Sequence, residues 1–151
     1  MSPGGWRLLL SASEIIGGAV GAVVFIAQAL DSARPVWHTA FAVLFCAVSA
    51  VAGWRLLRRL TGALGLSIAV QAAQVLWTWM PGAAYRMTSG IALVGSYTTG
   101  RGPDAIVGAT AAFRIGLPDP GAGIGAGINL FAVAALVALI HVRRASRLTT
   151  A

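Results

Sequence analysis

Four long apolar stretches constrain this chain more than any other feature of its sequence. They cover residues 8–30, 36–57, 60–81 and 121–142, and charged residues are almost absent from them. Each stretch is long enough to cross the roughly 30 Å hydrocarbon core of a bilayer as a helix. Because lipid offers no hydrogen-bond partner to an open backbone, we expect an all-α membrane protein, a bundle of four transmembrane helices.

The arginines predict how the bundle is oriented. All eleven basic residues are arginines, against four acidic residues, which gives a net charge of +7. Most of them flank apolar stretches on one side, so the positive-inside rule places both termini and the 58–60 turn in the cytoplasm of a bacterial-type inner membrane. We assign this charge to anionic lipid headgroups and expect no nucleic-acid partner. The arginines expected to anchor in headgroups are Arg55, Arg58, Arg59, Arg143 and Arg144.

The remaining segments are too short for a separate soluble domain. We expect one integral membrane domain with an outer cap at residues 82–120 and a basic cytoplasmic tail at 143–151. Glu14 interrupts the first apolar stretch, which argues against a cleaved signal peptide. All five tryptophans fall near predicted membrane boundaries, as expected of an aromatic belt. They are Trp6, Trp37, Trp54, Trp77 and Trp79.

The outer cap is too apolar to be a flexible linker. Apolar residues alternate before and after a turn sequence at 100–104, which predicts an outer β-hairpin. A short amphipathic helix that begins at Pro103 is the alternative, because residues 105–112 are rich in alanine. An isolated hairpin is marginally stable, so the cap needs the helices or neighbouring subunits to pack against.

Several polar side chains fall inside the apolar stretches on matching helix faces. One interpretation is that they hydrogen-bond between helices and fix the packing. The other is that they line a hydrated path, in which Glu14 acts as a proton carrier or cation site. An ion pair of Glu14 with Arg7 or Arg55 is a structural explanation of the same residue. The candidate pore or polar-core residues are Glu14, Gln28, Ser67, Gln71, Gln74, Thr78 and Asn129.

Glycines spaced four residues apart predict close helix packing. The same spacing suits either contacts within one bundle or an interface between subunits, and we expect a homo-oligomer. The glycines concerned are Gly17, Gly21, Gly121, Gly123, Gly125 and Gly127.

No catalytic residues, metal site or cofactor site is predicted, and the residues indicate no known family. Cys46 is the single cysteine, and His38 and His141 are predicted near opposite faces of the bilayer, so they cannot share one metal or haem. We do not expect an enzyme. The sequence favours a small channel or transporter in the lipid bilayer, passing an ion, proton or small solute. The alternative is a non-catalytic scaffold or sensor that binds a membrane or cytoplasmic protein.

Overall fold

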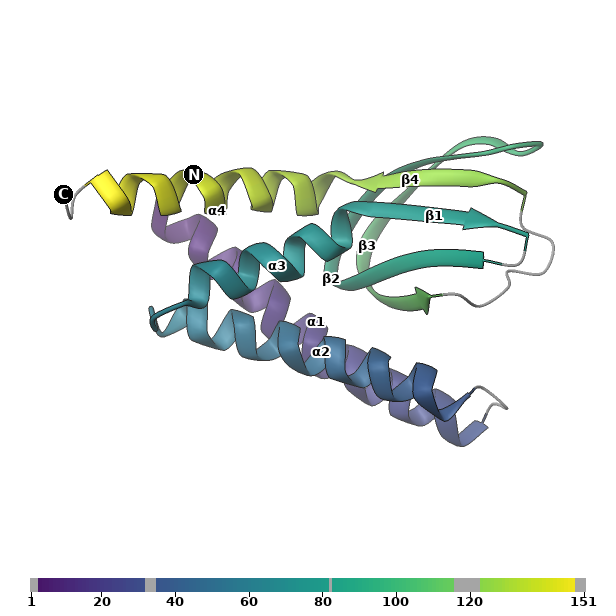
Figure 1. The fold of residues 1–151 in the computed structure, drawn as a ribbon, viewed down its shortest axis with the longest axis horizontal. Coiled ribbons are helices and arrows are strands. Elements are labelled where there is room, and N and C mark those ends of the chain that lie inside the picture. The colour runs from purple at the N-terminus through teal and green to yellow at the C-terminus, as the bar shows by residue number, and fades with distance from the viewer. Residues whose placement is uncertain (1–2, 32–34, 82, 116–122, 149–151) are drawn as a thin grey trace.

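The strands of the chain gather at one end of the molecule, and two of the helices run alongside them (Figure 1). The computed structural model describes residues 3–31, 35–81, 83–115 and 123–148. In chain order the elements are α1 (Pro3–Asp31), α2 (Val36–Leu57), α3 (Ala63–Val75), β1 (Leu76–Met80), β2 (Ala83–Thr98), β3 (Gly102–Ile115), β4 (Gly125–Asn129) and α4 (Leu130–Leu148).

The prediction of an all-α four-helix bundle is wrong. The described residues contain four helices and a four-stranded antiparallel sheet. Two of the helices, over Gly5–Leu30 and Val36–Leu57, are long and apolar enough to cross a membrane. The predicted helices at 60–81 and 121–142 are wrong in extent. Only 13 residues of the first are helical, in α3, and α4 begins at Leu130.

Local sequence explains both corrections. The segment after α3 reads Leu-Trp-Thr-Trp-Met, and aromatic and β-branched residues favour strands. The segment before α4 is glycine-rich, and each glycine disfavours a helix interior by about 1 kcal/mol. Both segments are apolar, so hydropathy alone does not separate strand from helix. Gly121 lies outside the described residues.

The predicted hairpin is present, and the alternative helix at Pro103 is wrong. β3 pairs with β2 along its whole length, from Ile115 opposite Tyr85 to Gly102 opposite Thr98. The sheet order is β1-β4-β2-β3, so β3 lies at an edge.

The first three strands in this order also close on themselves. β1 pairs with the beginning of β2, where Thr78 lies opposite Tyr85. β4 pairs with β1 and with the end of β2, where Val94 lies opposite Asn129. β2 therefore bends to reach both neighbours, and Gly90 in its middle has a φ of 110°, which favours glycine. We call the whole sheet, β1 to β4, the sheet lobe.

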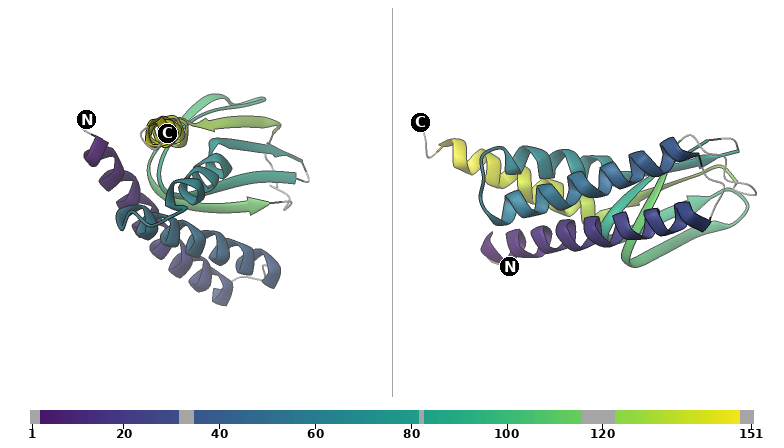
Figure 2. Two further views of the ribbon diagram at one scale, coloured as in Figure 1. Left: turned by 60° about the vertical axis from the view of Figure 1, so that its left-hand side comes forward. Right: turned by 90° about the horizontal axis from the view of Figure 1, so that it is seen from below.

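Two of the helices, α3 and α4, are joined to strands of the sheet lobe without a loop. α3 runs directly into β1, and β4 runs directly into α4 (Figures 1 and 2). α1 and α2 lie side by side along the other flank, and the aromatic ring of Phe113 in β3 packs against Phe25 of α1 and Phe45 of α2. One buried apolar cluster, made of Phe25, Ala42, Cys46, Met87 and Phe113, therefore joins α1 and α2 to the lobe.

Candidate functional site

Three of the predicted polar residues meet at one buried point. Glu14 in α1 is fully buried. One of its carboxylate oxygens accepts a hydrogen bond from Ser67 Oγ, and the other accepts one from Gln71 Nε2, each at 2.9 Å. Ser49 Oγ of α2 lies 3.5 Å from the main-chain oxygen of Glu14, to which it donates. This cluster, which we call the Glu14 seam, joins three helices through matched donors and acceptors.

Two predicted amides bind the backbone of β2 instead of each other. Gln74 Oε1 accepts from the Ser89 N–H at 2.9 Å, and Asn129 Oδ1 accepts from the Leu93 N–H at 3.3 Å. Asn129 Oδ1 also lies 3.4 Å from the Ala132 N–H in the first turn of α4, the contact of a helix N-cap. These amides hold β2 on both sides of its bend at Gly90.

The first-helix glycines are used within the chain. A Cβ on Gly17 would overlap the backbone of Gly90, and one on Gly21 would lie 2.8 Å from Cys46 Sγ. Ser13, on the same part of α1, accepts the Ile91 N–H through its Oγ at 3.1 Å. α1 therefore packs closely against both α2 and the sheet lobe.

Three of the other predicted glycines, Gly123, Gly125 and Gly127, do not lie in a helix, so their expected helix packing is wrong. Gly125 and Gly127 belong to β4, and Gly123 precedes it. A Cβ on Gly125 would overlap the ring of Trp79, and one on Gly127 would lie 3.0 Å from Ser96 Cβ. These residues bring β4 close to its neighbouring strands.

The remaining polar candidates are not brought into the Glu14 seam. Gln28 is exposed near the end of α1. Thr78 is half-buried in β1, where it pairs with Tyr85 and Ala126. Tyr85 donates its hydroxyl to the Ala73 main-chain oxygen at 2.6 Å, and burial raises its pKa, which favours the protonated donor form.

The five tryptophans predicted to lie at membrane boundaries differ in exposure. Trp37 and Trp54 are about half exposed near the two ends of α2, as an interfacial residue requires, whereas Trp77 is only 1% exposed. Trp6 and Trp79 are half-buried. Trp77 is therefore an interior residue of the sheet lobe.

Four of the five arginines predicted to anchor in headgroups are exposed. Arg58 and Arg59 are exposed between α2 and α3, and Arg143 and Arg144 are exposed in α4. Arg55 Nη2 donates to the Thr61 main-chain oxygen at 2.6 Å. Arg55 thus also fixes the turn between α2 and α3.

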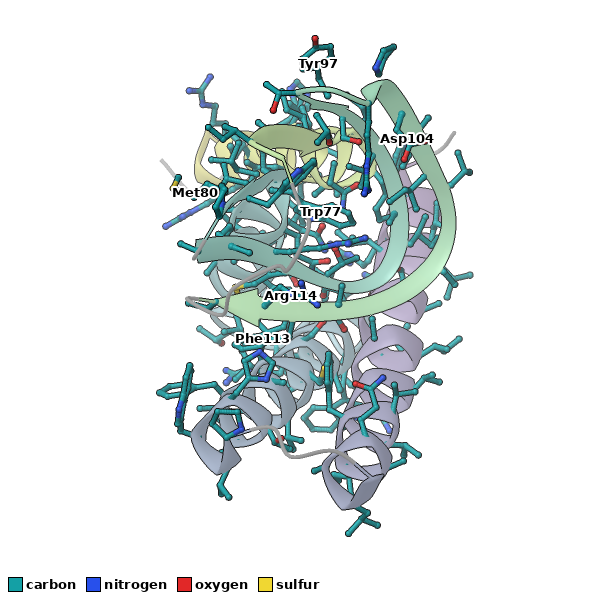
Figure 3. The ribbon with its side chains drawn as sticks, turned by 90° about the vertical axis from the view of Figure 1, so that its right-hand side faces the viewer. Trp77, Met80, Tyr97, Asp104, Phe113 and Arg114 are labelled. Atoms are coloured by element: carbon teal, nitrogen blue, oxygen red, sulfur yellow. The ribbon has the colours of Figure 1, made fainter. Side chains whose placement is uncertain are left out.

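A pocket of about 200 Å³ lies inside the curve of the sheet lobe. Figure 3 looks into this end of the molecule, with Trp77 and Arg114 inside the curve of the strands. We call it the lobe pocket. Its aromatic and charged lining residues are Trp77, Trp79, Arg86, Arg101, Asp104 and Arg114.

The lobe pocket was not predicted from the sequence, although one signal for it was present. Arg86 and Arg114 are equally distant from Gly100 along the chain. A hairpin centred on that glycine places them opposite each other, and they are indeed paired in the register. The two side chains face a pocket because β4 closes the sheet. The residues of β4 were predicted to be helical.

A larger groove of about 550 Å³ lies between α1 and the β2–β3 hairpin. Its walls are mainly apolar, and they include Ile16, Val20, Ile91 and Ala109. The side chains of the Glu14 seam do not line it. The groove and the seam are therefore separate features.

No established ligand chemistry identifies the Glu14 seam, the lobe pocket or the groove. Among the described residues, no group of three or more His, Cys, Asp and Glu side chains is placed to hold a metal ion. Comparison with protein-family models, with curated proteins and with solved structures finds no match.

Proposed function

We propose that this chain is a non-catalytic membrane subunit, a scaffold or sensor that holds the β2–β3 hairpin at the membrane surface and binds a protein partner through it. The observation that carries the proposal is the Glu14 seam. Both carboxylate oxygens have a donor at 2.9 Å, and Glu14, Ser67 and Gln71 are at most 2% exposed. A conduction path needs polar groups that face water, whereas these polar groups are used to join helices.

The membrane arrangement in this proposal is multi-pass, with both termini in the cytoplasm. α1 and α2 cross as helices. The 13 residues of α3 reach only about 20 Å, and β1 adds about 17 Å, so α3 and β1 together are long enough to cross. β4 and α4 cross in the same way. The closed pairing of β1, β4 and β2 supports this, because strand backbone in lipid must be bonded internally.

The protein-binding surface in this proposal is the open edge of β3. The glycine face of α1 is already occupied by α2 and the sheet lobe, which leaves it little room for a subunit contact. In contrast, β3 pairs only with β2 among the described strands, and Val107 is 76% exposed. An open edge of this kind accepts a further strand, from a second copy or another protein.

The test is to measure assembly and transport on the same preparations. We expect cross-linking in native membranes to capture an assembly that Val107→Lys abolishes, because an edge lysine blocks strand addition. Tyr97→Lys is the matched control, since Tyr97 is 58% exposed on β2 but lies away from the β3 edge. The Tyr97→Lys variant should still form the cross-linked assembly seen with the wild type.

Transport is measured with the purified chain in liposomes. We expect no flux of protons, monovalent cations or small neutral solutes above that of empty liposomes. Flux by the wild type that Gln71→Leu abolishes, while cross-linking is unchanged, would overturn the proposal in favour of a channel.

A further inference from the structure

We propose that the sheet lobe is sunk into the outer half of the bilayer, where the outward face of its strands contacts lipid acyl chains and the lobe pocket is hydrated. Only the turns at the far end of the lobe, such as the β2–β3 turn, reach the membrane surface. The inference rests on the crossing of α1 proposed above. It is carried by the depth at which the lobe touches α1, by the bonding of the strand backbone and by the polarity of the two faces of the sheet.

The depth follows from the contact between α1 and the bend of β2. Gly17 stands near the middle of the apolar stretch Gly5–Leu30, which is long enough to cross a membrane. A Cβ on Gly17 would overlap the backbone of Gly90, the residue at which β2 bends. Figure 1 shows this bend pointing toward the helices, with both arms of the hairpin leading away to the far end of the lobe. Where α1 crosses a bilayer, the bend therefore lies close to the middle of the hydrocarbon core.

The backbone around this bend has its hydrogen bonds inside the protein. The N–H groups of Ser89, Ile91 and Leu93 donate to side chains of α3, α1 and the end of β4, respectively. Lipid cannot accept these hydrogen bonds, so a strand bends within hydrocarbon only where the protein supplies other acceptors. The open edge of β3 is where a partner strand is proposed above, and such a strand would complete this bonding.

The outward face of the sheet lobe is apolar. In Figure 3, Met80 and Tyr97 point away from the curve of the strands, whereas Trp77 lies inside it. Acyl chains are the partner that an exposed apolar surface fits when it continues the surface of membrane-crossing helices. The large outward residues of the strands are each at least 40% exposed, and they are Leu76, Met80, Leu93, Tyr97, Val107 and Ile128.

The inward face carries the charge. The strands contain three charged residues, Arg86, Asp104 and Arg114, and all three line the lobe pocket, so none is on the outward face. A sheet in water shows the opposite pattern, with its apolar side toward a core and its polar side toward solvent. Strands in a membrane turn apolar side chains to lipid and polar ones inward. At about 200 Å³ the pocket has room for several waters, each of which takes about 30 Å³ in the liquid.

Two neighbouring residues of β3 allow a direct test. Ile106 lines the lobe pocket, whereas Val107 faces outward and is 76% exposed in the protein alone. Val107 is three residues from Thr110, the residue opposite Gly90, so it lies about 10 Å from the bend and within the outer half of the bilayer.

Ile106→Cys and Val107→Cys are made in the full chain and placed in phosphatidylcholine nanodiscs, which leave both membrane faces open. The rate of reaction with a quaternary-ammonium thiosulfonate is measured. We expect Ile106→Cys to react faster than Val107→Cys, the reverse of their exposure in the protein alone. Val107→Cys should react roughly tenfold or more slowly than Arg58→Cys at the exposed turn after α2, because hydrocarbon excludes a charged reagent. Cys46 is fully buried, so the wild type is the blank.

A second measurement separates lipid from protein as the cover of the outward face. The cysteine variants are labelled with a neutral bimane, and its fluorescence is quenched either by brominated acyl chains or by iodide in water. We expect bimane at Val107 to be quenched by the brominated chains and bimane at Arg58 by iodide. Leu93→Cys, directly opposite Val107 on β2, replaces Val107→Cys if size-exclusion elution or circular dichroism shows that the latter is not folded.

The control for the crossing of α1 is Val23→Cys. Val23 is 67% exposed and lies about 9 Å along α1 from Gly17, at a depth similar to that of Val107. Fast reaction at Val107 with protection at Val23 overturns the inference alone, whereas fast reaction at both also overturns the proposed crossing. The inference fails as well if Ile106→Cys reacts no faster than Val107→Cys, or if a protected Val107→Cys is not quenched by brominated chains.

Discussion

Buried polar groups are used differently in the two halves of this molecule. In the Glu14 seam, each carboxylate oxygen meets one neutral donor, and the three side chains are almost completely buried. In the lobe pocket, arginines of like charge face each other around a space large enough for a ligand. Matched groups in a dry contact stabilise the fold, whereas charged groups around a hollow leave space beside them. The comparison therefore separates residues that are enclosed by the fold from residues that line a pocket.

The largest effect should come from removing the close contact between α1 and the sheet lobe. Gly17→Ala places a Cβ against the backbone of Gly90, which cannot move aside as a side chain can. We expect a loss of about 3 kcal/mol in the free energy of unfolding, measured by denaturant titration in detergent. Gly65→Ala in α3 is the control. Its Cβ meets open space, so the change should be neutral or stabilise by up to about 1 kcal/mol. Equal losses in the two variants would contradict this role of Gly17.

A smaller loss is expected when the Glu14 seam loses its acceptor. Glu14→Leu leaves the Ser67 and Gln71 donors buried without a partner, which should cost about 2 kcal/mol of unfolding free energy. Replacing Ser67 by Ala and Gln71 by Leu in the same chain removes those donors and should restore part of the loss. If the triple variant is less stable than Glu14→Leu, the groups do not act as one unit.

The smallest effect on stability should come from the lobe pocket. Arg114→Gln changes a half-buried side chain that borders a hollow, so we expect a change in the free energy of unfolding of within about 1 kcal/mol. The thermal midpoint at low and high ionic strength measures it. A loss as large as that of Glu14→Leu would mean that Arg114 is part of the structural core, and the distinction between the two halves would fail.

Part of this architecture could be predicted from the sequence. The helices α1 and α2 follow from long apolar stretches, and the hairpin follows from alternation around Gly100. The other two predicted helices extended too far. Average hydropathy does not distinguish β1 and β4 from an apolar helix. The tryptophans and threonine of β1 and the glycines of β4 nevertheless disfavour a helix.

The polar residues, too, could be predicted only in part from the sequence. The spacing of Ser67, Gln71, Gln74 and Thr78 predicts one face of a single helix, because helix geometry is local. The first three are buried in α3, whereas Thr78 lies in β1. Their partners were not predictable in the same way. Gln74 binds the backbone of β2, a contact that requires the bend at Gly90 and the closure of the sheet. The lobe pocket was missed for this reason as well, since its walls come from strands that pair far apart in the chain.

The position of β4 in the chain has a consequence for biosynthesis. β4 pairs with β1 on one side and with the end of β2 on the other, yet it is the last strand to be translated. Until the ribosome has released it, both neighbours have open edges that water, lipid or another strand can reach. The helical hairpin of α1 and α2 is complete long before then. Formation of the α1–α2 hairpin and completion of the lobe are thus separate events, and the interval between them is when a nascent chain is most exposed to misassembly or to a chaperone.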